Sequence, residues 1–211
     1  RGRDFVLRPK IAVLVSGGGT NLQALLDAAR AGTLSSGDIA LVVSSRPGVY
    51  ALERAEAAGV PAVVVKRKGR SADDFERELL DTLAAHGIDL VVLAGFLCIL
   101  SPDFIARYEG RIVNVHPSLL PAFGGRGFYG LAVHEAALAR GVKVTGATVH
   151  LVNGIPHGGK ILLQRAVEVR EDDTLESLEA RTHDAEHALY PEVLRLVAEG
   201  RVSVGEDRKV H

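Results

Sequence analysis

Residues 114–121 read Asn-Val-His-Pro-Ser-Leu-Leu-Pro and hold the side chains best suited to chemistry in this sequence. Side chains two residues apart at a strand end point the same way, so Asn114 and His116 can face one pocket. A histidine can donate or accept a proton near neutral pH, and an asparagine amide can donate a hydrogen bond to an oxyanion. Prolines at 117 and 121 stiffen the segment. We predict a catalytic centre with His116 as general acid; the alternative is that this strand-end Asn-x-His is structural.

Residues 16–21 read Ser-Gly-Gly-Gly-Thr-Asn and precede a helical pattern. Glycines let backbone N–H groups approach an anion, and a helix N-terminus adds partial positive charge, so the segment is typical of a phosphate site. It is not a Walker A loop because it lacks the lysine, and Leu22 excludes a full G-x-G-x-x-G pattern. The alternative is a tight strand-to-helix turn in which Thr20 or Asn21 caps the helix.

The loop at residues 152–160 contains His157 among glycines and a proline. His157 could lie near His116, and the alternative is an exposed loop histidine. Cys98 stands in the run Phe-Leu-Cys-Ile-Leu of residues 96–100, which indicates a pocket wall or core position rather than a nucleophile.

His183 and His187 stand four residues apart on an expected helix, a spacing that zinc ligands use. No motif places a third ligand, and Glu186 does not occupy the glutamate position of the H-E-x-x-H pattern. We therefore expect no metal at this helix.

The composition limits the partners that the protein can have. Among 211 residues, 25 basic and 26 acidic side chains leave a net charge of -1, which argues against nucleic acid or an anionic membrane as a partner. The single cysteine excludes an internal disulfide and fits a reducing, cytoplasmic setting. No apolar run reaches the roughly 18 residues that span a bilayer, and the first nine residues do not read as a signal peptide.

Short apolar runs alternate with helical patterns along the first half of the chain. The sequence predicts strands at residues 10–16, 39–44, 62–66, 90–94, 111–115, 144–152 and 161–169, and helices at residues 21–31, 50–58, 71–86 and 131–140. A last helix should run to Arg195, with Asp173 as its N-cap and Glu176 at the capping-box position. Residues 119–128 should form a loop.

The alternation predicts an α/β fold: a Rossmann-like, mostly parallel, twisted sheet with helices on both faces. We expect one domain at residues 10–204, a flexible extension at residues 1–9 and a tail at residues 205–211. Ligands of such sheets bind beyond the carboxyl ends of the strands. The loops at residues 17–21, 95–100 and 114–123 should therefore converge on one site.

Five segments together resemble a known family: S-G-G-G-T-N-L-Q at 16–23, V-V-L-A-G-F at 91–96, I-L-S-P at 99–102, N-V-H-P-S-L-L-P-A-F at 114–123 and E-H-A-L-Y-P at 186–191. They are similar to the folate-dependent formyltransferases, and more narrowly to the phosphoribosylglycinamide formyltransferase family, over about residues 10–204. The N-x-H-P-S-L-L-P element is also shared by formyltetrahydrofolate hydrolases. The glycine loop and the last segment carry the narrower resemblance.

The resemblance implies transfer of a formyl group from 10-formyltetrahydrofolate, the co-substrate, to the amine of glycinamide ribonucleotide in de novo purine (IMP) biosynthesis. The amine would attack the formyl carbon. Asn114 and protonated His116 would stabilise the oxyanion, and proton transfer would release tetrahydrofolate without a metal. The expected partners are these small molecules alone, and the protein should be a monomer or homodimer.

The resemblance also assigns site residues. Asn114, His116 and position 157 would be catalytic. The ribonucleotide and its phosphate would contact Gly19, Thr20, Asn21, Leu22, Gln23, His183, Asp184, Ala185 and Glu186. The pteridine pocket would be formed by Leu97, Cys98, Ile99, Leu100, Asn114, Val152, Asn153 and His157, and the loop at residues 151–157 would close over it.

The sequence departs from the family pattern at residues 157–160, which read His-Gly-Gly-Lys where the family has Asp-Gly-Gly-Pro or Asp-Thr-Gly-Pro. The Asp normally pairs with the catalytic histidine and favours its charged form. A second histidine cannot do so. We therefore expect His116 to be protonated less often, and the protein to bind both ligands but turn over poorly unless another carboxylate substitutes. Gly18 in place of Asn and Cys98 in place of Arg are milder departures.

Three other functions fit parts of the pattern. A formyltetrahydrofolate hydrolase would use water in place of the amine, and usually carries an N-terminal regulatory domain that we do not expect ahead of Lys10. A methionyl-tRNA formyltransferase would need a C-terminal RNA-binding domain and a basic surface. A catalytically weakened protein that binds folate or ribonucleotide is supported by His157 and Lys160.

Overall fold

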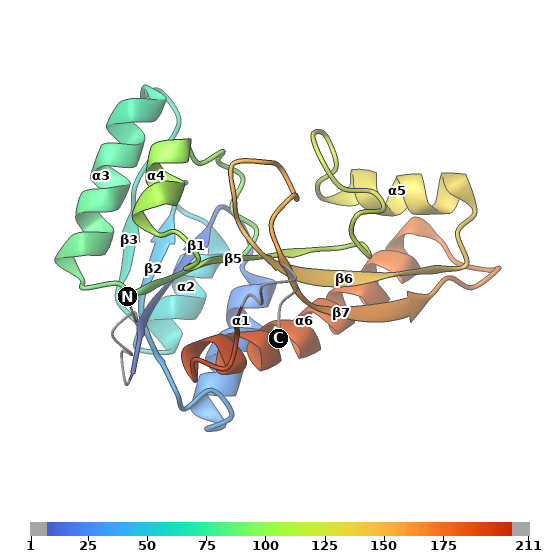
Figure 1. Cartoon of the computed structure of the whole chain (residues 1–211), viewed down its shortest axis with the longest axis horizontal. Helices are drawn as coiled ribbons and strands as arrows, with labels where there is room; N and C mark the ends of the chain where they lie inside the picture. Colours follow the sequence, from blue (N-terminus) through green and yellow to red (C-terminus); the bar gives the residue numbers. More distant parts are fainter. Residues whose placement is uncertain (1–7, 204–211) are drawn as a thin grey trace.

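The computed structural model describes residues 8–203, and the strands in this range form one seven-stranded sheet (Figure 1). The spatial order is β3-β2-β1-β4-β5-β6-β7. Strands β1 to β5 pair in parallel, whereas β6 pairs antiparallel with β5 and with β7, so the predicted mostly parallel sheet is confirmed. The strands are β1 (Lys10–Val15), β2 (Asp38–Ser44), β3 (Ala62–Val64), β4 (Leu90–Leu93), β5 (Ile112–His116), β6 (Val144–Leu151) and β7 (Ile161–Glu168).

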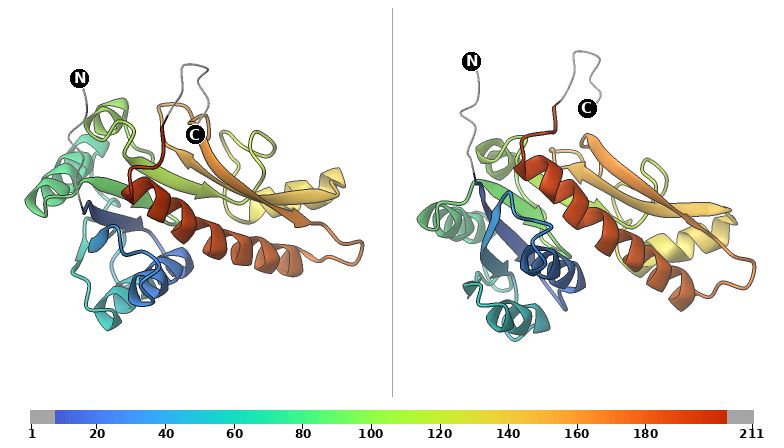
Figure 2. Two further views of the ribbon diagram at one scale, coloured as in Figure 1. Left: turned by 60° about the horizontal axis from the view of Figure 1, so that its bottom comes forward. Right: turned by 90° about the horizontal axis from the view of Figure 1, so that it is seen from below.

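Helices cover both faces of the sheet, as predicted (Figures 1 and 2). One buried cluster joins the sheet to α1 (Thr20–Arg30), α2 (Tyr50–Ala57) and α6 (Leu175–Ala198), and a second joins it to α3 (Ala72–Ala85) and α4 (Pro102–Arg107). Alternate residues of β1 enter the two clusters, Ile11 and Val13 one, Ala12 and Leu14 the other. This double burial is why the strand reads as an unbroken apolar run.

The sheet has its topological switch point between β1 and β4, because the chain runs outward from β1 to β3 and then returns to the other side of β1. The segments that follow these two strands are joined by hydrogen bonds. The N–H of Ser16 donates to the carbonyl of Gly95 (3.2 Å), and the N–H of Leu97 donates to Ser16 Oγ (3.0 Å). A ligand site is expected at such a point.

The start of α1 differs from the prediction. Gly19, not Thr20 or Asn21, is the N-cap, and its φ of 77° is in the left-handed region that favours glycine. A Cβ at Gly19 would lie 2.7 Å from Ala51 Cβ, so α2 also packs too closely for any other residue. The side-chain cap, which the sequence offered as the alternative, is therefore wrong. The contact of Gly19 with α2 is not visible in the local sequence.

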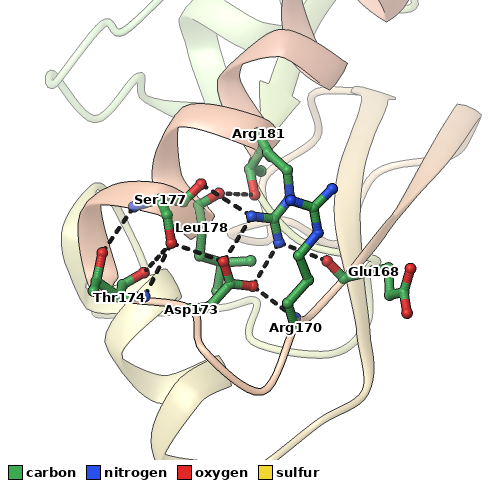
Figure 3. A network of polar contacts seen from close by, with 8 residues as sticks. Glu168, Arg170, Asp173, Thr174, Ser177, Leu178 and Arg181 are labelled. Atoms are coloured by element: carbon green, nitrogen blue, oxygen red, sulfur yellow. Dashed lines mark hydrogen bonds and ion pairs between the residues drawn. The ribbon is translucent and has the colours of Figure 1, made fainter.

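The start of α6 also differs (Figure 3). Thr174, not Asp173, is the N-cap, and Ser177, not Glu176, is its reciprocal capping-box partner. Asp173 instead accepts hydrogen bonds from the Arg181 guanidinium at 2.6 and 2.5 Å (Figure 3). The N-cap was misplaced by one residue because the Asp173 side chain is engaged by Arg181, about two turns further along the helix. The helix also ends later than predicted, at Ala198 rather than Arg195.

The helix α4 was not predicted. Ser101 caps it by accepting the N–H of Phe104 at 3.2 Å, and Pro102 opens its first turn. Ser-Pro is a helix-start signal that was present in the sequence. The buried Glu76 of α3 accepts the N–H of Ser101 at 2.7 Å, which ties the end of the segment after β4 to α3.

The remaining helix, α5 (Leu131–Arg140), lies next to α6, with the rings of His134 and His183 6.2 Å apart. Most of the predicted terminal segments lie outside the described residues, but Arg8 pairs with Asp38 and the carbonyl of Pro9 accepts the N–H of Asp38 at 3.0 Å. Within residues 8–203, no helix is both long enough and apolar enough to cross a membrane.

Candidate active site

Strand β5 ends at His116 and carries the two predicted catalytic side chains. Asn114 lies opposite Leu93 of β4 on one side and opposite His150 of β6 on the other. His116 is 2% exposed and Asn114 is partly buried. Being two residues apart, their side chains lie on one face of the sheet, opposite Val115, which packs in the cluster of α1 and α6.

The segment after β5 is held by two polar side chains of the antiparallel strands. Thr148 Oγ1 donates to the carbonyl of Ser118 (2.7 Å) and accepts the N–H of Leu120 (3.1 Å). Gln164 Nε2 donates to Thr148 Oγ1 and to the carbonyl of Leu120, both at 3.0 Å. Sequence reasoning missed Thr148 and Gln164, because no local motif shows which strand lies beside β5.

His116 is neutral in this environment. Its Nε2–H donates to the carbonyl of Phe123 (2.8 Å). Burial is the main cause that lowers the pKa of His116 from 6.5 to about 4; the Phe123 carbonyl opposes it, and neighbouring histidines, His157 foremost, lower the pKa further. None of these groups is a carboxylate. The predicted direction is confirmed, but burial is its largest cause and His157 a smaller one.

His157 lies against His116, as predicted, with ring centroids 4.0 Å apart. Its Nδ1 accepts the N–H of Gly125 at 2.8 Å, so this nitrogen carries no proton. Burial is the largest cause acting on the pKa of His157, and it lowers that pKa. Its φ of 54° is in the left-handed region, where a non-glycine residue is strained, and such strain concentrates at functional sites.

His150 is a further residue of this site that sequence reasoning missed. It is 2% exposed, and its Nδ1–H donates to the carbonyl of Leu151 at 3.0 Å. Nε2 therefore holds a lone pair, which faces Asn114 Nδ2 at 3.4 Å. This contact orients the amide and leaves its second N–H available. The only signal in the sequence was that His150 stands near the end of a predicted strand.

The predicted pteridine-pocket residues fall into two environments. Leu100 is buried, and Cys98 and Val152 pack against the same cluster, so the two segments that contain them come together. Leu97 and Ile99 are exposed, Ile99 by 94%. Cys98 therefore lies at the core, as predicted from its apolar neighbours.

The loop after β6 is shaped by its own side chains. Asn153 Oδ1 accepts the N–H of Ile155 (2.9 Å), and its Nδ2 donates to the carbonyl of Gly158 (3.2 Å). A Cβ at Gly159 would lie 1.6 Å from the carbonyl oxygen of Leu151, so only glycine fits there. Asn153, predicted to bind a ligand, is thus engaged within the loop.

The glycine loop and α6 bring together buried polar atoms that have no hydrogen-bond partner in the described part of the chain. They are Asn21 Oδ1, Glu186 Oε2 and His187 Nε2. Burial raises the pKa of Glu186 to about 8, against the opposing effect of the Asn21 amide, so Glu186 is mostly protonated at neutral pH. Unpartnered buried polar groups are rare, and at this place a ligand or an ordered water would supply the missing partners.

The other predicted substrate-binding residues differ in what they can offer. His183 Nε2 lies 3.7 Å from Glu186 Oε2 and 3.8 Å from Glu179 Oε1. Leu22 is fully buried in the core and Ala185 is 7% exposed, so Leu22 can present only its backbone N–H. Asp184 is exposed. Within residues 8–203, no three His, Cys, Asp or Glu side chains are arranged to hold a metal ion.

Comparison with known proteins defines the class. Residues 9–194 match the family described as formyl transferase, and the chain belongs to this family. Within it, the chain is similar to phosphoribosylglycinamide formyltransferases, which confirms the resemblance seen in the sequence. The Haemophilus influenzae enzyme of that name is 40% identical over 199 residues, which cover 94% of this chain and 91% of the other.

Two solved structures and one larger relative extend the comparison. Glycinamide ribonucleotide transformylase 1 from Symbiobacterium toebii superposes with a TM-score of 0.90 at 43% identity, covering 100% of this chain and 97% of that one. A formyltetrahydrofolate deformylase from Pseudomonas syringae reaches 0.87 at 28% identity, covering 96% and 65%. The trifunctional purine biosynthetic protein adenosine-3 of Gallus gallus is 44% identical over 211 residues, all of this chain but only 20% of the relative.

Proposed function

We propose that the protein transfers the formyl group of 10-formyltetrahydrofolate to the amine of glycinamide ribonucleotide, a step of de novo purine biosynthesis. The observation that carries this is the pairing of Asn114 with the buried His116 at the end of β5, in a chain 40% identical to a phosphoribosylglycinamide formyltransferase over nearly its whole length. We place it in the cytoplasm as a monomer or homodimer, with these two small molecules as its partners.

The chemistry follows from the atoms at the site. The amine nitrogen attacks the formyl carbon, a C–N bond forms, and the carbonyl electron pair moves to oxygen. The free N–H of Asn114 and a protonated His116 donate to this oxyanion. Because Nε2 of His116 donates its hydrogen bond to the carbonyl of Phe123, Nδ1 is the ring nitrogen that can donate to the substrate. The bond from the formyl carbon to the folate nitrogen then breaks, and the proton lost by the amine ends on that nitrogen.

We assign the remaining binding roles from the positions of the residues. The glycine loop and the N-terminal turn of α1 offer backbone N–H groups to the phosphate. Glu186 and His183 offer polar atoms to the rest of the ribonucleotide. Residues 97–100 with the loop after β6 take the pteridine. No residue in this scheme requires a metal.

A specific observation supports a second candidate, a catalytically weakened binding protein. Because no carboxylate raises the pKa of His116, its charged form is scarce at neutral pH. The hydrolase reading has less support, since the deformylase is only 28% identical. We propose slow transfer as the primary function.

Measuring tetrahydrofolate release with and without glycinamide ribonucleotide separates the three functions. We expect release only when the amine is present. Release that is independent of the amine would identify a hydrolase. No release, together with binding of both ligands, would identify a binding protein and overturn the proposal.

A further inference from the structure

Arg54 of α2 reaches across to the glycine loop. Its Nε donates to the carbonyl of Gly18 at 2.8 Å, and its Nη1 donates to Gln23 Oε1 at 3.2 Å. The guanidinium carbon lies 4.6 Å from the centre of the Tyr50 ring, which stacks on it. The same helix makes one more contact, because the N–H of Ala51 donates to the carbonyl of Gly17 at 3.3 Å.

These contacts decide where the loop N–H groups point. In a planar trans peptide the N–H points away from the C=O that precedes it. The carbonyls of Gly17 and Gly18 face α2, so the N–H groups of Gly18 and Gly19 face away from it. The first backbone N–H groups of a helix have no intrahelical partner. In α1 the first such bond runs from Gln23 to Gly19, which leaves the N–H groups of residues 20–22 open beside those of the loop.

A second observation indicates that a ligand belongs here. Glu186 is 5% exposed, and its Oε2 has no hydrogen-bond partner among the described residues. It lies beside Asn21 in the first turn of α1, where Asn21 Oδ1 is also unpartnered. The charge of Arg54 also reaches α6, where it adds to the larger effects of burial and of His183 in lowering the pKa of His187.

We propose that Arg54 is a positioning residue for the phosphate of the ribonucleotide: it holds the Gly17 and Gly18 carbonyls toward α2, so that the loop N–H groups face the anion. This rests on the proposed function, which supplies the phosphate. Arginine suits the role because its planar fork reaches two acceptors while stacking on an aromatic ring. Lysine has the charge but not the fork.

The test compares Arg54→Met and Arg54→Lys with the native chain. Calorimetry measures binding of glycinamide ribonucleotide and of its dephosphorylated nucleoside, and of ribose 5-phosphate and ribose. Arg54→Met should weaken binding of both phosphorylated ligands by about tenfold or more, as expected when charge-assisted hydrogen bonds are lost. Binding of the two dephosphorylated ligands should change by less than about twofold. Arg54→Lys should fall between the native chain and Arg54→Met.

A matched control is Arg77→Met on α3, where an exposed arginine pairs with Asp74 at 3.6 Å. It should bind every ligand as the native chain does. In turnover, the Arg54 variants should raise KM for the ribonucleotide and leave kcat and KM for the folate near native, which a general loss of structure would not do.

Each other outcome contradicts the inference, the proposed function or both. Equal losses for phosphorylated and dephosphorylated ligands would make Arg54 merely structural, and no loss would make it irrelevant. If the native chain binds ribose 5-phosphate through Arg54 but not glycinamide ribonucleotide, the proposed function fails while the role of Arg54 stands. If neither phosphorylated ligand binds the native chain, both fail.

Discussion

The rings of His116 and His157 lie against each other at an angle of 41°, with centroids 4.0 Å apart, and no carboxylate is among the groups that act on the pKa of either ring. With a pKa of about 4, only about one His116 ring in a thousand is charged at pH 7. If the charged ring is the general acid, its scarcity at pH 7 limits the rate, and the gain from charging His116 at lower pH is opposed by protonation of the attacking amine. Burial, with a smaller contribution from His157, therefore sets the pH range in which His116 is charged.

The substitution His157→Asp tests this at residue scale. A carboxylate against His116 should raise its pKa, and each unit of increase multiplies the charged fraction at pH 7 about tenfold. We expect kcat/KM for formyl transfer at pH 7 to rise, and the pH at which the rate declines to move upward. The measurement is the pH profile of kcat/KM.

His157→Asn is the matched control, because asparagine tolerates the left-handed backbone at this position and carries no charge. It removes only the small effect of His157 on the pKa of His116, so the pH profile should move far less than in His157→Asp. A value of kcat/KM that falls or stays the same in His157→Asp would contradict our account of this loop.

At the scale of elements, the start of α6 depends on Asp173. Its carboxylate, 3% exposed, accepts hydrogen bonds from Arg181, from Ser177 Oγ at 2.7 Å and from the N–H of Arg170 at 2.7 Å (Figure 3). Arg181, then the other donors, hold the pKa of this carboxyl far below its usual 3.8. Because the folded pKa is lowered, the stabilisation is present above about pH 4 and is lost as the pH falls further.

We predict that Asp173→Asn lowers the free energy of unfolding by about 1–3 kcal/mol at pH 7, the usual cost of losing hydrogen bonds to a charged group. Urea denaturation measures it. The difference in the free energy of unfolding between the native chain and the variant should become smaller as the pH is lowered below 4. Asp172→Asn, at an exposed neighbour, is the control and should change little. An equal loss at both positions would contradict the assignment.

At the scale of the whole molecule, the sequence was sufficient to predict the strands of the sheet. It was insufficient to predict the contacts between segments that are distant in the chain. Apolar runs located the seven strands, and in β1 and β4 such a run reflects burial on both faces of the sheet. Likewise, Asn114 and His116 were found because one short segment holds both. The helix α4 was missed although Ser101 and Pro102 signalled it.

The parts that could not be predicted are contacts between distant segments. His150 lies beside Asn114 only because β6 pairs antiparallel with β5 in one register. Arg54 reaches the glycine loop only because α2 packs on it. Tyr190 of α6 donates to the carbonyl of Leu93 at 2.7 Å and to that of Val113 at 3.0 Å, which holds the helix under β4 and β5. No local motif encodes these pairings.

The central claim, that Asn114 and His116 form the chemical centre, is tested most directly by His116→Ala. Formyl transfer to glycinamide ribonucleotide is measured together with calorimetric binding of the ribonucleotide. Our account predicts that transfer is abolished while the ribonucleotide binds with near-native affinity, because its phosphate site lies at the glycine loop. Loss of binding along with transfer would make His116 structural, and transfer at the native rate would place the chemistry elsewhere.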